Sequence, residues 1–354
     1  MNKIEFPRLG VDGKEYTREY IHQWYLTTFE DAVKKRLEEL EYNSQYKGQK
    51  DFVKKLISNL TLLLTGTPPK LKSFIDSLHS DYIKIASKKV YKPYMTKGKR
   101  RKQTFAKGLL HAMGYENYRE SKLVELSRML NIKVCPYCNH NFTLYIDILG
   151  KTNMKGLFQF DHFYDKSDYP YLSMSLYNLI PSCSYCNHQK RTTQLDIRYN
   201  PYFKAISEEF HFKVVDSFQL RSGKKGADKI DIKIERNVSR QGVDELQNDL
   251  HLEEQYGRHR DIVQEIYDKV YNETYYRNML TCIPDEDREK LLNQWLGIPL
   301  DKNDIDKRPL TKFCQDVLKQ ARMEYGRGNI NSKIIYYEYN YYLHIGHPLY
   351  WENS

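Results

Sequence analysis

The chain lacks any long hydrophobic run and any apolar leader. The leucine-rich stretch at Leu60–Leu64 is far shorter than the roughly 20 apolar residues that a transmembrane helix needs. The residues that follow Met1, NKIEFP, do not form the apolar core of a secretory signal. We therefore expect a soluble, cytoplasmic protein that does not enter a membrane.

Cysteine is scarce, with six residues in the whole chain. Cys282 and Cys314 have no C-x-x-C companion, so the pattern indicates a reducing compartment rather than a disulfide framework. The other four form two matched pairs, Cys135-Pro-Tyr-Cys138 and Cys183-Ser-Tyr-Cys186. Two such knuckles supply the four thiolates of a structural zinc site, which leaves no open position for a reacting water. The alternative is two unrelated turns with free thiols.

Acidic residues are outnumbered by basic ones. The chain has 56 Lys and Arg against 46 Asp and Glu, a formal net charge of +10. This excess favours a polyanionic partner, because neutralising phosphates releases their counterions. The densest basic stretch contains Lys99, Arg100, Arg101 and Lys102. We expect these four residues to contact the backbone of DNA; the alternative is a flexible, solvated loop.

Hydrophobic periodicity predicts a mainly α fold with a small central α+β module. Residues 1–130 are expected to form a helical N-terminal domain, with helices at 71–92 and 119–130. Residues 131–205 form the central module. It is expected to contain strands at 141–149 and 157–163, an ordered loop at 165–177, an extended piece at 178–181 and a helix from Ser184.

The C-terminal region, residues 206–354, begins with a predicted β-hairpin and continues as helices. The strands are expected at 210–220 and 229–235, on either side of a Gly/Lys-rich turn. Helical spacing of apolar residues then predicts helices at 251–272, 285–296, 311–325 and 331–344.

Four short motifs follow one another between Cys135 and Lys190, the span that contains both cysteine pairs. They are Cys135-x-x-Cys138, Phe160-Asp161-His162-Phe163, Tyr177-Asn178-Leu179-Ile180-Pro181 and Cys183-x-x-Cys186-Asn187-x-x-Lys190. A lone Asp-His or Asn-Leu step is common, but this ordered set inside two knuckles is not. The span resembles the HNH endonucleases, whose core is the ββα-metal fold, and it covers about 60 residues of the chain.

The resemblance implies a role for each matching residue. His162 corresponds to the general base that takes a proton from the attacking water, a task that suits an imidazole. Asp161 and Asn187 correspond to ligands of a catalytic Mg²⁺ or Mn²⁺, and Asn178 to a residue that braces the loop behind the histidine. Adjacent residues on a strand face opposite ways, so a twist or bulge has to bring Asp161 and His162 to one site.

Three positions leave alternatives open. Asp165 stands where relatives are expected to have proline, and we expect it to face solvent. His188 is a second candidate ligand beside Asn187, or else a histidine on the helix surface. Lys190 is expected to begin the exposed side of the helix, where it either contacts phosphate or is simply solvated.

The segment from Asp161 to Asn187 looks most like bacterial HNH proteins of Septu-type anti-phage defence systems. In such systems an ABC-type ATPase partner controls the nuclease, and this chain carries no G-x-x-x-x-G-K-[ST] motif of its own. The resemblance thus implies a DNA endonuclease with an ATPase partner. Two alternatives are an inactive zinc-stabilised module that binds DNA or a partner, and a restriction-type nuclease.

Overall fold

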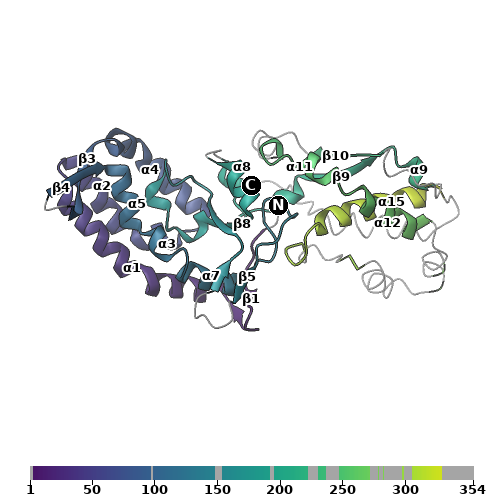
Figure 1. The fold of residues 1–354 in the computed structure, drawn as a ribbon, viewed down its shortest axis with the longest axis horizontal. Helices are drawn as coiled ribbons and strands as arrows, with labels where there is room; N and C mark the ends of the chain where they lie inside the picture. The colour runs from purple at the N-terminus through teal and green to yellow at the C-terminus, as the bar shows by residue number, and fades with distance from the viewer. Residues whose placement is uncertain are drawn as a thin grey trace, which may run out of the picture. The chain divides into compact units, whose positions relative to one another are not determined.

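Helices dominate the chain, with small two-stranded antiparallel sheets between them (Figure 1). The computed structural model describes residues 3–96, 99–147, 154–191, 195–221, 230–236, 247–271, 278, 282, 297–298 and 305–328. The prediction of a mainly α fold with a few small sheets is therefore confirmed. The helices predicted at 285–296 and 331–344 lie outside the described residues.

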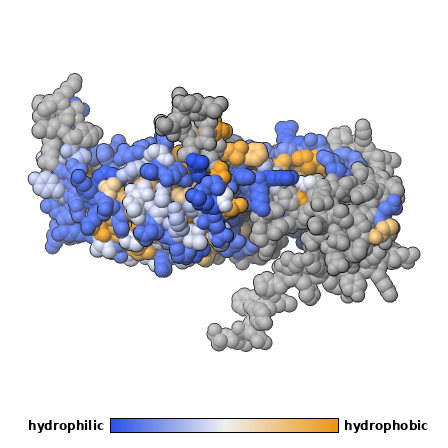
Figure 2. Space-filling model, turned by 90° about the horizontal axis from the view of Figure 1, so that it is seen from below, coloured by the Kyte–Doolittle hydropathy of each residue, from blue (hydrophilic) through white to orange (hydrophobic). Residues whose placement is uncertain are grey.

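The chain divides into two compact units. The first comprises residues 1–208, 240–250 and 306–309, and the second comprises 209–239, 251–305 and 310–354. Figure 2 shows that hydrophilic side chains cover most of the described surface on the face it presents. In the described part of the chain, each helix is either too short or too polar to cross a bilayer.

The first unit begins with a helical layer around one long helix. The helices are α1 (Arg18–Asn43), α2 (Lys47–Ser58), α3 (Leu60–Thr65), α4 (Pro68–Ala86), α5 (Phe105–Met113), α6 (Tyr115–Tyr118) and α7 (Lys122–Leu130), preceded by the short strands β1 (Arg8–Leu9) and β2 (Glu15–Tyr16). The Thr17 side chain accepts a hydrogen bond from the Tyr20 amide at the start of α1. Apolar residues three or four positions apart, such as Tyr25 and Phe29, are fully buried along α1.

A β-hairpin replaces part of what periodicity predicted as helix and loop. Helix α4 ends at Ala86, and β3 (Lys89–Thr96) pairs with β4 (Lys99–Thr104). The prediction of a helix to Lys92 is therefore wrong at its end. Val90 is fully buried, and a β-branched residue followed by tyrosine favours a strand here. The hairpin contains the basic stretch.

The central module contains two strand pairs and a helix. Strands β5 (Tyr145–Asp147) and β6 (Met154–Gly156) pair with each other, as do β7 (Gln159–His162) and β8 (Leu179–Ser182), and α8 (Ser184–Lys190) follows. The strands predicted at 141–149 and 157–163 share one backbone hydrogen bond, from the Leu157 amide to the Leu144 carbonyl at 2.7 Å, but each pairs mainly with another strand. All four residues of β8 are buried, including the polar Ser182, so β8 lacks the alternation of buried and exposed residues that marks half-exposed strands.

The loop between β7 and β8 contains the short 3₁₀ turns η1 (Pro170–Leu172) and η2 (Leu176–Asn178). Every residue from 169 to 183 is buried. This burial agrees with the predicted ordered loop, but the sequence did not indicate that so many of its residues would be buried. Beyond α8, η3 (Ile197–Tyr199) and η4 (Ile206–Glu208) lead to the end of the first unit's main segment.

The second unit is a hairpin packed with helices. Its elements are β9 (Phe210–Val215), α9 (Phe218–Arg221), β10 (Asp231–Arg236), α11 (Leu252–Tyr256), α12 (Arg260–Tyr271) and α15 (Thr311–Gly328). The predicted hairpin and the helix at 311–325 are confirmed, but the first strand, predicted to reach residue 220, ends at Val215 and is followed by the short helix α9. The predicted helix at 251–272 is interrupted, because α11 ends before Gly257 and α12 begins at Arg260. Phe212, Tyr256 and Phe313 form the aromatic core of this unit.

Helix side chains satisfy the outer edge of β9. Gln320 of α15 accepts a hydrogen bond from the Val214 amide and donates one to the Val214 carbonyl, both at 2.8 Å. Asp316, one turn earlier on α15, accepts from the Phe212 amide at 2.9 Å. On β10, Glu253 accepts from the Ile234 amide at 2.8 Å. These contacts satisfy backbone groups that a further strand would otherwise bond.

Replacing Gln320 by alanine is expected to expose this edge. The substitution removes both bonds to Val214, and an unsatisfied backbone group costs about 1–3 kcal/mol. Hydrogen exchange at the Val214 amide should therefore accelerate by roughly one to two orders of magnitude. Gln264→Ala is the matched control, because Gln264 bonds Asp268 on its own helix α12. Equal exchange rates at Val214 in the two variants would contradict this account.

Candidate functional site

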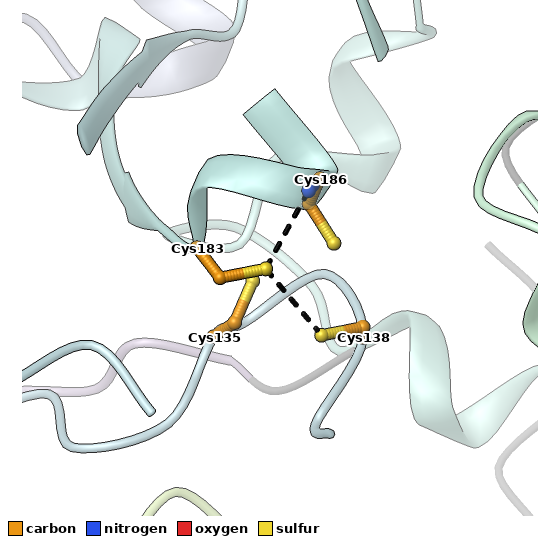
Figure 3. A group of neighbouring side chains, drawn as sticks. All are labelled: Cys135, Cys138, Cys183 and Cys186. Atoms are coloured by element: carbon orange, nitrogen blue, oxygen red, sulfur yellow. Dashed lines mark hydrogen bonds between the residues drawn. The ribbon is translucent and has the colours of Figure 1, made fainter. Parts of the chain in front are cut away.

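The four paired cysteines converge on one point (Figure 3). Their sulfur atoms all lie within 4.8 Å of one another, and all four residues are buried. Cys183 is the N-cap of α8, and its sulfur accepts from the Cys186 amide at 3.5 Å; the Cys138 sulfur accepts from the His140 amide at 3.4 Å. Asn139 adopts a left-handed conformation that closes the first knuckle.

The sulfur cluster fits a tetrahedral metal ion such as zinc. A Zn–S bond of about 2.3 Å implies sulfur–sulfur separations of about 3.8 Å, and the Cys138 and Cys183 sulfurs are 3.9 Å apart. Hydrogen bonds from Cys135, Cys138 and Cys186 hold the pKa of the Cys183 thiol well below its ordinary value, which favours the thiolate. Bound zinc would connect the first knuckle to the start of α8 and would leave no position for water.

A buried ionic contact links the knuckles to the hairpin. The Asp161 carboxylate accepts from the Tyr137 hydroxyl at 2.6 Å, and the Lys190 ammonium lies 3.2 Å from the same oxygen, Oδ2. Lys190 also donates to the carbonyls of His162 and Phe163, at 3.1 and 3.2 Å. Its side chain is 0% exposed. The expectation that Lys190 lies on the exposed side of the helix is therefore wrong.

Asp161 and Asn187 do not form a divalent-cation site as they stand. Asp161 is only 3% exposed, and the neighbouring ammonium already balances its charge. Burial raises the pKa of Asp161, while Lys190 and Tyr137 act in the opposite direction. The Asn187 amide donates to Gln159 of β7. Carboxylate and amide oxygens suit Mg²⁺, but an ion here would first have to displace Lys190.

His162 is held on the other side of β7. Its Nε2 lies 3.1 Å from the Ser173 carbonyl, which can only accept, so Nε2 carries the proton. The ring packs edge-on against Tyr115, with centroids 4.6 Å apart. The residue is 6% exposed, and burial lowers the pKa of His162 to about 3. The neutral imidazole therefore keeps its lone pair on Nδ1.

The strand geometry does not bring Asp161 and His162 together through a bulge. The four residue pairs of β7 and β8 follow one another without a register shift, with Asp161 opposite Ile180 and His162 opposite Leu179. Successive side chains therefore leave β7 on opposite faces. Asp161 reaches Lys190 on α8, whereas His162 reaches Ser173 in the loop. The expected bulge is absent from these four pairs.

Asn178 ties together the two ends of the loop that follows β7. Its amide donates to the carbonyls of Tyr164 and Leu172, at 3.1 and 3.0 Å, and its oxygen accepts from the Tyr164 amide at 2.7 Å. Asn178 is almost fully buried. These bonds fix the loop against β8, and the same loop presents the Ser173 carbonyl to His162.

The remaining candidates lie at the surface. His188 is exposed on α8, and Asp165 is half-buried and accepts from the amide of Ser167. Arg101 and Lys102 are exposed on β4, with the Lys102 ammonium 4.8 Å from the Tyr91 ring centre. Lys99 and Arg100 belong to β4 by their backbone, and their side chains lie outside what the structure describes.

Sequence reasoning missed the groups that hold the candidate residues in place. Tyr137 stands between two cysteines, and its hydroxyl donates to Asp161, a contact that the metal-ligand spacing of the motif does not indicate. Tyr115 and Ser173, which contact the His162 ring, are not among the residues to which the resemblance assigns a role. The C-P-Y-C tyrosine is the one signal that was available, because a hydroxyl next to a buried knuckle needs a partner.

Comparisons of this chain with protein-family models, with curated proteins and with solved structures found no match, so the likeness to HNH endonucleases is carried by the motif residues alone.

Proposed function

We propose that this chain is an endonuclease that hydrolyses phosphodiester bonds of DNA, with His162 as the general base. The supporting observation is the hydrogen bond from His162 Nε2 to the Ser173 carbonyl. It orients the ring and leaves Nδ1 without a proton, which is the state a proton acceptor needs. The hairpin β7–β8 followed directly by α8 has the element order of a ββα nuclease core.

In the proposed reaction a water molecule transfers a proton to Nδ1 of His162 as its oxygen attacks the phosphorus. The bond from phosphorus to the 3′ oxygen breaks, that oxygen takes up a proton from solvent, and the protonated His162 returns its proton to solvent. The products have 5′-phosphate and 3′-hydroxyl ends. The resemblance adds a Mg²⁺ or Mn²⁺ ion at Asp161 and Asn187, which would stabilise the negative charge of the phosphate. Since Lys190 occupies that carboxylate, no step is assigned to the ion.

A plasmid-nicking assay tests the proposal. Purified chain is incubated with supercoiled DNA in Mg²⁺, in Mn²⁺ and in EDTA, and the appearance of open-circular DNA is followed with time. We expect nicking in the two metal buffers and its loss in EDTA, because EDTA removes every divalent ion, including the sulfur-bound zinc that holds the module together. Intact plasmid in all three buffers, from protein that carries its zinc, would refute the proposed activity.

A second candidate is a zinc-stabilised module that binds DNA without cutting it. The ion pair between Asp161 and Lys190 favours this reading, because it leaves the carboxylate without a free charge for a metal ion. Retention of DNA in a filter-binding assay without any nicking would select it. A restriction-type enzyme, the third possibility, predicts nicking that depends on methylation of the plasmid.

We also propose that the β3–β4 hairpin contacts the DNA backbone. The chain contains no acidic residue between Asp81 and Glu116, a stretch that includes the whole hairpin. Phosphate contacts of this kind add affinity without sequence preference. A two-stranded ribbon is also narrow enough to lie in a groove of the duplex.

Replacing Arg101 and Lys102 by glutamine together is expected to weaken DNA binding about tenfold and to lower the salt slope. Each lost phosphate contact reduces the dependence of log K on log salt by about 0.9, so the slope should fall by nearly two. The control replaces Lys72 and Lys122, which pair with Asp76 and Glu125, and makes the same change in net charge. Equal slopes for both double variants would reject the contact.

The likeness to Septu-type systems extends the proposal to a defence role with an ABC-type ATPase partner. Co-purification of the chain with the product of a neighbouring ATPase gene is the direct test. Nuclease activity that ATP alters only in the presence of that partner would support the extension. If no ATPase gene lies next to the gene for this chain, the proposed ATPase partner would have no support.

A further inference from the structure

Three consecutive buried residues next to the site are each bonded to a different part of the molecule. The Ser173 carbonyl accepts from His162 Nε2 at 3.1 Å. The Met174 carbonyl accepts from the Tyr25 hydroxyl at 2.9 Å. The Ser175 hydroxyl donates to the Leu63 carbonyl. Tyr25 belongs to α1 and Leu63 to α3, so two helices of the N-terminal layer hold the turn that orients His162.

The support for this turn is rigid. Tyr25 is fully buried in a 26-residue helix, and its ring packs against Phe29 with centroids 4.6 Å apart. Burial raises the pKa of Tyr25 well above its ordinary value, so the hydroxyl stays a donor. Two residues beyond Ser175, the Tyr177 hydroxyl is hydrogen-bonded to His22 of α1 at 2.8 Å. The helix thus holds the loop at two points.

We infer that Tyr25 and Ser175 are positioning residues for His162. Their bonds fix the peptides that follow the Ser173 carbonyl, and that carbonyl selects the Nε2-protonated form of the imidazole and sets the direction of Nδ1. The inference rests on the proposed role of His162 as a base. The inference assigns the N-terminal helices a role in the site. A displacement of α1 would move the Met174 peptide that Tyr25 holds, and with it the Ser173 carbonyl that orients the imidazole.

The test combines a tautomer measurement with a kinetic one. The double variant Tyr25→Phe, Ser175→Ala removes both bonds and keeps the buried rings and volume nearly unchanged. Ser127→Ala is the control, because it deletes another buried hydroxyl that bonds a backbone carbonyl in the same unit, at 2.6 Å. Histidine labelled with ¹⁵N reports the tautomer, and His162→Gln assigns the signal.

We expect a single Nε2-protonated form in the wild type and in Ser127→Ala, and a mixture of tautomers in the double variant. The kcat for nicking should fall about tenfold in the double variant with KM unchanged, because misorientation of a base affects only the transition state. A double variant that matches Ser127→Ala in its tautomer signal overturns the inference. If the wild type does not cut DNA, the proposed function fails, and the tautomer signal alone decides the positioning role.

Discussion

Replacing His162 by glutamine is expected to lower the rate of DNA nicking by about 10²–10⁴-fold, the usual contribution of a general base. Glutamine has an amide that can donate to the Ser173 carbonyl, as Nε2 does, but it has no group that accepts a proton at neutral pH. The variant therefore keeps the loop contact and removes only the base. The rate of open-circle formation under single-turnover conditions is the measurement.

The controls separate chemistry from folding. His111→Ala removes an exposed imidazole from α5 and should leave the rate within about twofold of the wild type. Zinc content and thermal unfolding of His162→Gln should match those of the wild type. A variant that folds, carries zinc and nicks at the original rate would show that His162 is not the base.

Removing the sulfur-bound metal is expected to have the largest effect on stability. Structural zinc sites contribute roughly 10–16 kcal/mol of apparent binding free energy at neutral pH, which is comparable with the total stability of a whole domain. The variant Cys138→Ser should therefore lose the metal and the order of the segment from Cys135 to Lys190. Metal analysis should find one zinc per chain in the wild type, and proteolysis should cut this segment in the variant only.

Cys282→Ser is the matched control, because Cys282 is exposed and lies outside the sulfur cluster. It should keep the zinc and the protease resistance of the wild type. Addition of a strong chelator to the wild type should reproduce the Cys138→Ser pattern. A chain that binds no zinc, or that stays protease-resistant after its removal, would contradict the structural role of the thiols.

Local patterns predicted the sulfur cluster and the mainly helical fold. A C-x-x-C pair forms a tight turn, so the geometry of its two thiols depends on four consecutive residues. A four-sulfur site then requires only that two such turns come together in the fold. Long amphipathic stretches such as 311–325 were also predictable, since their period repeats over several turns. In both cases the information lies within a few residues of the feature it determines.

Pairings over long sequence distances were not predictable in this way. Strand β7 pairs with β8 across a loop of 16 residues, of which all from 169 onward are buried, and the sequence of β7 does not indicate which strand it pairs with. Lys190 looked like a surface residue because a lysine at the end of a short helix normally faces water. Its burial follows from Asp161, a carboxylate that needs a cation once it leaves solvent.

The side chains of α15 that occupy the outer edge of β9 also bear on how the protein behaves at high concentration. A strand with open amides and carbonyls is a template on which a second molecule can add its own strand, and fibrils grow in this manner. Because Asp316 and Gln320 already bond Phe212 and Val214, that template is blocked from within. At Phe212 and Val214 the block to strand addition therefore comes from two polar residues of a helix, in addition to the exposed Lys213 that β9 itself carries.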